Sequence, residues 1–235
     1  MNFPILSSII FLPLVSSIFI FLSKGQKNSN GAIYISLFSS LATFILSLFV
    51  WYSMDYGSAD FQFLEEQSWI NDFIKFKLGV DGISILFIVL TTLITPICII
   101  SCINSVKERV KEFLIAILIL ETFMIGVFCS LDLVVFYLFF EAGLIPMFLI
   151  IGVWGGPRKV YSAFKFFLFT LLGSVLMLVA IIAIYWITGT TDIIQIYEIK
   201  IPIEYQKLLW LAFFSSFAVT MPMWPVHTWL PDAHV

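Results

Sequence analysis

Residues 131–154 read LDLVVFYLFFEAGLIPMFLIIGVW, and this stretch decides the fold class. Its charged side chains are Asp132 at the start and Glu141 near the middle, and the remaining residues are apolar, aromatic or small. About 20 predominantly apolar residues are enough to cross a bilayer. Inside lipid the backbone must satisfy its own hydrogen bonds. The stretch therefore predicts a membrane-spanning helix with a carboxyl group close to its middle.

The whole chain has the same character. It holds 235 residues, of which 61% are hydrophobic and 11% are charged, whereas soluble chains carry roughly 25% charged residues. We therefore predict an all-α polytopic membrane protein with about seven transmembrane helices, the seventh discontinuous. The predicted spans are 3–23, 31–52, 82–104, 113–129, 132–154, 160–186 and 208–230.

The loops between these spans differ in charge, and this difference predicts the orientation. Basic residues gather in the odd-numbered loops, whereas the even-numbered loops are longer and acidic. Because Lys and Arg collect in cytoplasmic loops, we expect the odd loops to face the cytoplasm or the mitochondrial matrix. The N-terminus would then lie on the periplasmic or intermembrane side. The basic residues are Lys24, Lys27, Lys107, Arg109, Lys111, Arg158 and Lys159, and the acidic ones are Asp55, Asp60, Glu65, Glu66, Asp72, Asp192, Glu198 and Glu204.

Several classes of function are disfavoured by the sequence. A net charge of −3 argues against nucleic acid as a partner. The chain has no GxGxxG, Walker or HExxH motif. Cys98, Cys102 and Cys129 all fall within predicted spans, whereas an iron–sulfur cluster needs four thiolates and structural zinc needs four loop ligands. We expect these cysteines to be small buried hydrophobes, and we expect neither a metal nor a redox cofactor on this chain.

Glu141 is the clearest polar residue within a span. An ionised carboxylate at mid-bilayer costs ~3 kcal/mol or more unless it is paired, hydrated or protonated. Ala142 and Gly143 would let a neighbouring helix approach closely, and Pro146 frees a carbonyl one turn earlier. A neutral side chain hydrogen-bonded between helices is the structural alternative. We favour a proton-handling role for Glu141.

Glu121 is a second carboxyl at a similar depth. The fourth and fifth predicted helices meet near Leu131, and Glu121 and Glu141 each lie ten residues from it. Each carboxyl is therefore ~15 Å into the membrane. Two carboxyls at one depth suit groups that take up and release protons. Whether they face each other depends on helix rotation, so Glu121 is equally consistent with a functional and a structural role.

Two further charged residues lie nearer the span ends. Lys165 is six residues past Lys159, roughly 9 Å inside the cytoplasmic boundary. Its side chain could extend outward to the boundary or take part in proton transfer, and the sequence does not separate these roles. Asp132 stands at the start of its helix, where a helix cap is the favoured interpretation.

The seventh span contains a predicted break. Pro222 and Pro225 directly follow Thr220, about halfway across, and each proline removes a backbone donor. We predict two half-helices there. Discontinuous membrane helices often mark ion sites in transporters, and His227 is the titratable side chain beside the break. A structural proline kink is the alternative.

These residues together carry a family resemblance. The motifs are LGVDGIS (78–84), FFEAGLIPMFLIIGVWGG (139–156), AFKFFLFTLLGS (163–174) and MPMWPVHTWLPDAHV (221–235). In combination they resemble the antiporter-like, proton-pumping subunits of respiratory complex I (NADH:quinone oxidoreductase), closest to its subunit 4 (M) type in alphaproteobacteria or mitochondria. The resemblance covers residues 78–235, and residues 1–77 add weak support.

The resemblance implies a membrane-arm subunit that couples electron transfer from NADH to quinone to proton translocation. NADH, FMN, iron–sulfur clusters and quinone would be bound by partner subunits. The expected partners are other membrane-arm subunits and the lipid of a bacterial or mitochondrial inner membrane. Glu141 matches the essential glutamate of the family's fifth helix, Lys165 a lysine of the sixth and His227 the histidine of the broken seventh.

Two features depart from the family. The pattern before the first proline of the break is Val-Lys-x-Pro, but here it is VTMP, with Thr220 in place of the lysine. Because a threonine cannot supply the positive charge, we expect weakened or absent pumping through this channel. Family members are also roughly twice as long and have a second, inverted set of helices. We therefore expect residues 1–77 to form two helices and an outer loop. Residues 78–235 would be antiporter-like helices truncated after the break, whose missing half a second chain could supply.

Two other functions remain open on the sequence. One is a subunit of a multi-subunit sodium/proton antiporter, which shares the fold and the buried glutamate, and sodium-dependent transport would favour it. The other is a non-pumping truncated remnant with a structural role, which Thr220 and the early end favour.

Overall fold

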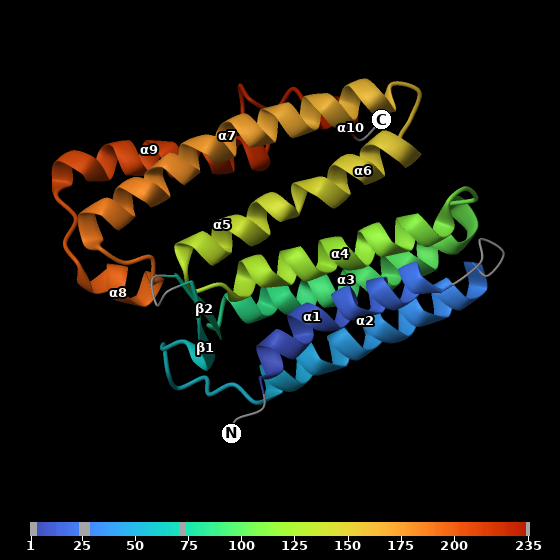
Figure 1. The fold of residues 1–235 in the computed structure, drawn as a ribbon, viewed down its shortest axis with the longest axis horizontal. Helices are drawn as coiled ribbons and strands as arrows, with labels where there is room; N and C mark the ends of the chain where they lie inside the picture. The colour runs from blue at the N-terminus through green and yellow to red at the C-terminus, as the bar shows by residue number, and fades with distance from the viewer. Residues whose placement is uncertain (1–3, 24–28, 71–73, 234–235) are drawn as a thin grey trace. The chain divides into compact units, whose positions relative to one another are not determined.

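The computed structural model describes residues 4–23, 29–70 and 74–233. Lys24, Lys27 and Asp72, which contributed to the orientation above, lie outside these ranges. The described chain is mostly helical (Figure 1). Its helices are α1 (Ile5–Leu22), α2 (Ser29–Tyr52), α3 (Ser84–Ser105), α4 (Val110–Cys129), α5 (Leu133–Ala142), α6 (Leu144–Trp154), α7 (Lys159–Thr188), α8 (Ile193–Glu198), α9 (Ile203–Thr220) and α10 (Leu230–Ala233).

The predicted fold class, an all-α polytopic membrane protein, is confirmed in its helical architecture. Within the described ranges, six helices are long and apolar enough to span a membrane: Ile5–Leu22, Asn30–Tyr52, Ser84–Ile103, Val110–Cys129, Leu133–Trp154 and Lys159–Thr188. The seventh predicted span is not among them. Its helix, α9, begins earlier than expected with the polar residues Glu204, Gln206 and Lys207, and it ends at Thr220.

The outer loop expected before residue 77 contains an antiparallel element that the sequence did not predict. Strands β1 (Gln62–Ile70) and β2 (Ile74–Val80) pair as a two-stranded sheet. Glu65 of β1 caps α1, because its carboxylate accepts hydrogen bonds from the backbone N–H groups of Leu6 (2.7 Å) and Ser7 (3.0 Å). A negative group at a helix N-terminus satisfies donors that have no partner within the helix. Part of the acidic loop is therefore structural.

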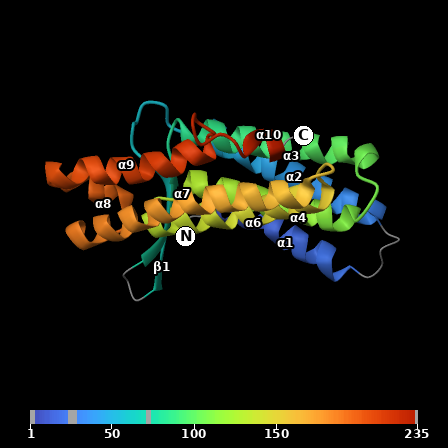
Figure 2. The same cartoon turned by 90° about the horizontal axis from the view of Figure 1, so that it is seen from above.

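The chain divides into two compact units. The first comprises Met1–Gln67 and Lys77–Ser130, and the second comprises Ser68–Phe76 and Leu131–Val235. In the first unit, helices α1 to α4 pack side by side (Figures 1 and 2). A small apolar core joins them, formed by Ile20, Ala32, Ile99, Leu114 and Leu118.

The outward faces of the membrane helices are also apolar. Phe38 of α2 is 78% exposed and Leu172 of α7 is 73% exposed. Contiguous exposure of this kind is rare on soluble monomers, and it is what lipid contact requires. Cys98 shares this outward face of α3, so the expectation that it is buried is wrong, whereas Cys129 is buried as expected.

In the second unit, the stretch predicted as one helix over 132–154 is interrupted between α5 and α6 at Gly143. Pro146 has no N–H to donate to the carbonyl of Ala142, which explains the local distortion. Gly143 keeps right-handed helical angles (φ −61°, ψ −24°), so the chain continues in one direction. Nearby, α7 and α9 lie side by side (Figure 2).

The expected cap at Asp132 is confirmed. Its Oδ1 accepts hydrogen bonds from the N–H groups of Val134 (2.8 Å) and Val135 (3.2 Å), at the start of α5. The Thr191 hydroxyl donates to the other oxygen (2.5 Å), and the Leu133 N–H donates to the Thr191 carbonyl (2.9 Å). Asp132 therefore joins the start of α5 to the turn that follows α7.

This geometry predicts a stability difference between two substitutions of Asp132. Asp132→Ala leaves the first-turn N–H groups without a side-chain acceptor, and we expect a loss of about 1–2 kcal/mol in the free energy of unfolding. Asp132→Asn keeps one acceptor oxygen and should cost less. Thermal unfolding in detergent measures both, and equal destabilisation by the two substitutions would contradict a capping role.

Candidate functional site

Glu141 is placed in the last turn of α5, directly before the interruption at Gly143. Its carboxyl approaches the hydroxyl of Ser174 on α7. Tyr137, one turn earlier on α5, approaches the same hydroxyl and interacts with the Glu141 carboxyl. The Glu141 Oε1 atom is buried and has no hydrogen-bond partner among the described residues. These three side chains form the polar centre of the second unit.

Ser174 determines what this centre can accept. The residue is completely buried, and its hydroxyl donates to the Leu171 carbonyl at 2.9 Å. A hydroxyl has a single hydrogen to donate. The lone pairs that face Tyr137 and Glu141 can therefore accept hydrogen bonds, and a protonated Glu141 carboxyl would supply a donor.

The C-terminal turn of α9 lies at the same level of the unit. Gly173, beside Ser174, permits this approach, because a Cβ atom added there would be 3.2 Å from the Val219 Cβ and 3.4 Å from the Ser216 Cα. The Ser216 side-chain oxygen is buried and has no described partner. Small residues at such contacts are typical of closely packed membrane helices.

Thr220 is the last residue of α9, one turn after Ser216. A contact on the α5 side supports its placement near Glu141, since the rings of Phe140 and Phe217 meet edge to face with centroids 6.5 Å apart. The Thr220 hydroxyl donates to the Ser216 carbonyl at 3.0 Å. The position expected to hold a lysine is thus occupied by a neutral side chain bonded to its own helix.

The predicted break in the seventh helix is confirmed at the end of α9, but the second half-helix expected within 208–230 is not present among the described residues. Residues 221–229 form turns and bends, and the four-residue helix α10 follows. Two of the carbonyls in the last turn of α9, those of Ala218 and Val219, accept hydrogen bonds from the segment after the break. The Met223 N–H donates to the Ala218 carbonyl (2.8 Å), and the Trp229 indole N–H donates to the Val219 carbonyl (2.9 Å).

His227 lies in the non-helical segment after the break. Its Nδ1 atom is buried and makes no hydrogen bond to the part of the chain that the structure describes. The side chain itself is half-buried. His227 therefore lies beside the break as expected, and its role in proton transfer stays a prediction.

Lys165 forms an ion pair that the sequence reasoning missed. Its Nζ atom is 2.6 Å from Oδ2 of Asp232, and Nη2 of Arg158 is 3.0 Å from the other oxygen. The hydrogen bond and the charge of Lys165 hold the pKa of Asp232 below its usual range. The sequence alone could not pair Asp232 with Lys165, because the pair forms only where the segment after the break packs against α7.

The candidate residues of the second unit are arranged along α7. Lys165 and Ser174 are nine residues apart, which corresponds to about 13 Å along the helix. Trp229 spans part of this length, since its ring lies 5.1 Å from that of Phe166 and its N–H reaches the Val219 carbonyl. Phe217, three residues before Thr220, contacts Phe140, which precedes Glu141 on α5. Lys165, by contrast, is paired with Asp232 of the segment after the break.

Glu121 belongs to the first unit, where it is 2% exposed on the inward face of α4. The Thr95 hydroxyl of α3 approaches its carboxyl, but neither carboxyl oxygen has a partner in hydrogen-bonding geometry among the described residues.

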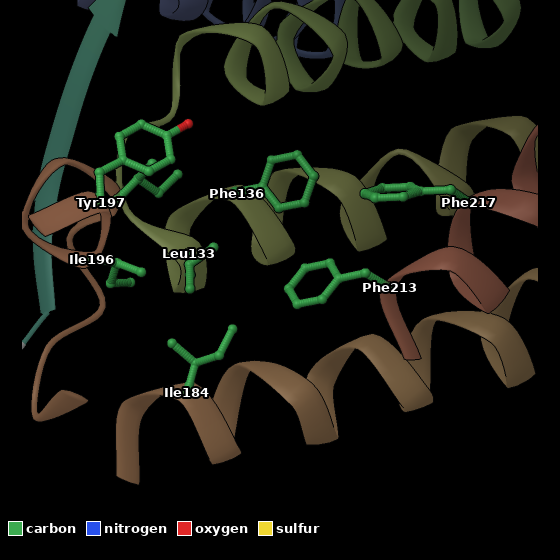
Figure 3. A pocket seen from close by; sticks show the side chains of 8 residues that line it. Leu133, Phe136, Ile184, Ile196, Tyr197, Phe213 and Phe217 are labelled. Atoms are coloured by element: carbon green, nitrogen blue, oxygen red, sulfur yellow. The ribbon is translucent and has the colours of Figure 1, made fainter. Parts of the chain in front are cut away.

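A pocket of about 300 Å³ lies at the other end of α7 (Figure 3). Its lining is almost wholly apolar, so it is not a site for proton chemistry. The Tyr197 hydroxyl is its one ionisable group among the lining residues, which are Leu133, Phe136, Ile184, Ile193, Ile196, Tyr197, Phe213 and Phe217.

Fold and site together define a multi-pass helical membrane protein with a half-buried carboxyl beside a broken helix. Residues 130–235 match the family described as NADH:quinone oxidoreductase/Mrp antiporter, transmembrane. The chain is 51% identical to NADH-quinone oxidoreductase subunit M of Rhodobacter capsulatus, over 98% of this chain and 48% of that protein. It is 50% identical to NADH-ubiquinone oxidoreductase chain 4 of Marchantia polymorpha, over 98% of this chain and 47% of that protein.

The chain is also similar to part of a solved structure. The chain matches one chain of respiratory complex I from Thermus thermophilus with bound NADH, with a TM-score of 0.85 and 26% identity, over 97% of this chain and 46% of that one. The predicted resemblance to subunit M (chain 4) is therefore confirmed. The chain spans about half of the length of the relatives it matches.

Proposed function

We propose that the chain works as part of a membrane-arm subunit of NADH:quinone oxidoreductase and that Glu141 binds and releases the transported proton. The observation that supports this proposal most directly is the environment of the Glu141 carboxyl. Its carboxyl has a buried oxygen without a described partner, beside a hydroxyl whose free lone pairs accept. The similarity to subunit M and chain 4 over nearly the whole chain supports the assignment to this complex.

The proposed roles of the other residues follow from their positions. Ser174 and Tyr137 would orient the Glu141 carboxyl and stabilise its protonated form through hydrogen bonds. His227, with its buried Nδ1 atom, would exchange protons beside the broken helix. Lys165 and Asp232 would fix the segment after the break against α7.

The proposal includes partners that the chain itself does not contain. Other membrane-arm subunits would flank it in a bacterial or mitochondrial inner membrane, with the N-terminus on the periplasmic or intermembrane side. NADH, FMN, iron–sulfur clusters and quinone would be bound by partner subunits. A second chain could supply helices corresponding to the remaining half of the relatives.

NADH-driven proton uptake by inverted membrane vesicles tests this function. We expect uptake that depends on the chain and is insensitive to sodium, and we expect the chain to co-purify with NADH:quinone oxidoreductase activity. The alternative of a sodium/proton antiporter subunit, whose family the matched description also names, predicts sodium-dependent exchange without NADH. The structural-remnant alternative rests on Thr220 and predicts assembly with no contribution to uptake.

Substitution of Asp232 should impair transport moderately. Asp232→Asn removes the charge that pairs with Lys165, and we expect NADH-driven proton uptake to fall several-fold while the chain still assembles. Arg158→Gln is a matched control, because Arg158 meets the same carboxylate from a more exposed position, and it should have a smaller effect. Equal uptake in Asp232→Asn and wild-type vesicles would remove the pair from the mechanism.

The low pKa of Asp232 also predicts where pH should have no effect on this pair. Because the pKa of Asp232 is lowered in the folded protein, the ion pair stabilises the fold fully at pH values above the ordinary aspartate pKa of ~3.9. The contribution is lost only as the pH falls through the lower, folded-state value. A change in uptake between pH 5 and pH 8 should therefore persist in Asp232→Asn vesicles.

A further inference from the structure

The first unit contains a buried carboxyl that the proposed function does not use. Glu121 lies on the inward face of α4, in register with the core residues Leu114, Leu118 and Ile125. It is 2% exposed, and both of its carboxyl oxygens are buried without a hydrogen-bond partner among the described residues. The side chain points toward α3, since its interacting neighbour is the Thr95 hydroxyl. A membrane helix gains no stability from a carboxyl placed in this way.

The inward faces of α2 and α3 carry hydroxyl groups where apolar residues would pack more simply. We call this set the hydroxyl stripe. Its members are 8% exposed or less, and Ser47 Oγ and Thr92 Oγ1, 2.8 Å apart, connect the two helices. On α2 the stripe extends from Ser36 to Ser47, about 16 Å. The members are Ser36, Ser39, Ser40, Thr43 and Ser47 of α2 and Thr91, Thr92 and Thr95 of α3.

The hydroxyl stripe offers acceptors rather than donors toward the interior. Nearly all of its hydroxyls donate to carbonyls of their own helix, for example Thr95 to the Thr91 carbonyl (3.0 Å) and Thr43 to the Ser39 carbonyl (2.9 Å). Each hydroxyl has only one hydrogen. Pro96 lacks an N–H, so the Thr92 carbonyl also loses its usual helical donor. The Thr95 oxygen beside Glu121 therefore has lone pairs that can accept a hydrogen bond, and Ser39, whose hydroxyl has no described partner, is the exception within the stripe.

The protonation state of Glu121 decides whether these lone pairs receive a donor. An ionised carboxylate would add one more acceptor and a buried charge, which costs several kcal/mol without a cationic partner. A protonated carboxyl supplies an O–H group within reach of the Thr95 oxygen. The site is thus internally consistent only when it holds a proton or another species that can interact with oxygen lone pairs.

We propose that Glu121, facing Thr95 and the hydroxyl stripe, is a second proton-binding site, contained within the first unit and separate from Glu141. In the uptake step the carboxylate takes a proton from hydronium, which leaves as water, and an O–H bond forms on Glu121. The hydroxyl stripe accepts hydrogen bonds from the water that exchanges this proton. The site depends on residues of the first unit alone, so it stands independently of the transport role proposed for Glu141.

Carbodiimide labelling of membranes that contain the chain tests the proposal directly. Dicyclohexylcarbodiimide enters lipid and adds the O–H of a protonated carboxyl across its C=N bond. The resulting O-acylisourea rearranges by an O-to-N acyl shift to a stable N-acylurea, which mass spectrometry detects. We expect label on Glu121 that declines as the pH is raised. Glu112 is the matched control, because it lies on the same helix but is half exposed and paired with Arg109, and it should remain unlabelled.

A second measurement detects the protonated carboxyl without any reagent, so it remains informative if the carbodiimide does not reach Glu121. Infrared spectra of the same membranes should show a carboxylic acid C=O band that disappears in Glu121→Gln. Thr95→Val should shift this band and Thr95→Ser should restore its position, which a merely structural threonine would not do. Identical spectra for wild type and Glu121→Gln, or protection of Glu121 from label by sodium ions, would overturn the proposal. Neither outcome would bear on NADH-driven uptake through Glu141.

Discussion

Glu141→Gln is expected to abolish NADH-driven proton uptake while leaving the chain folded. Glutamine keeps the length and the hydrogen-bonding capacity toward Ser174 and Tyr137, but it cannot release a proton. A positioned proton-transfer group contributes at least about 100-fold to the rate of its step, so uptake should fall by about that factor. Proton uptake by inverted vesicles, normalised to the amount of assembled chain, measures the effect.

The controls separate chemistry from packing at this position. Glu141→Asp retains a carboxyl on a shorter side chain and should restore part of the uptake. Ser174→Ala removes the hydroxyl that faces the carboxyl without removing the proton carrier, so it should have a smaller effect than Glu141→Gln. Uptake in Glu141→Gln equal to that of wild type would show that the proton does not pass through Glu141.

Membrane spans were predictable from this sequence because lipid imposes a length and a composition on every crossing. The rotation of each helix about its axis was not, because residues that face lipid and residues that face the core are both apolar. Cys98 illustrates this, since nothing in its surroundings distinguishes the outward face of α3 from the inward one. The exception is α2, where Ser36, Ser40, Thr43 and Ser47 recur with helical spacing and mark the buried face.

The polar site was predictable in its individual residues but not in its pairings. A carboxyl, a lysine and a broken helix stand out against an apolar background, so Glu141, Lys165 and the segment after Thr220 could be selected. Partners such as Asp232 are 67 residues away from Lys165 in sequence, and only the packing of the chain after the break brings them together. The β1–β2 hairpin was not predicted either, because the sequence of its polar strands resembles that of a solvated loop.

Thr220→Lys is expected to increase proton uptake if the missing lysine limits transport. Thr220 ends α9 three residues after Phe217, whose ring meets that of Phe140, the neighbour of Glu141. Two opposite unit charges ~8 Å apart attract each other by about 2 kcal/mol at an effective dielectric constant of ~20, which sets the scale for a lysine ammonium introduced here. This energy changes a proton-binding equilibrium roughly 30-fold and favours release of the proton from Glu141.

The expected result is a several-fold gain in protons taken up per NADH oxidised. Thr220→Gln is the matched control, because it lengthens the side chain and breaks the hydroxyl bond to the Ser216 carbonyl without adding charge. If Thr220→Gln matched the gain of Thr220→Lys, side-chain length rather than charge would be the cause. If neither substitution raised uptake, Thr220 would not limit transport. The function would then be complete without the lysine, or the chain would not pump at all, and the loss of uptake in Glu141→Gln distinguishes these two cases.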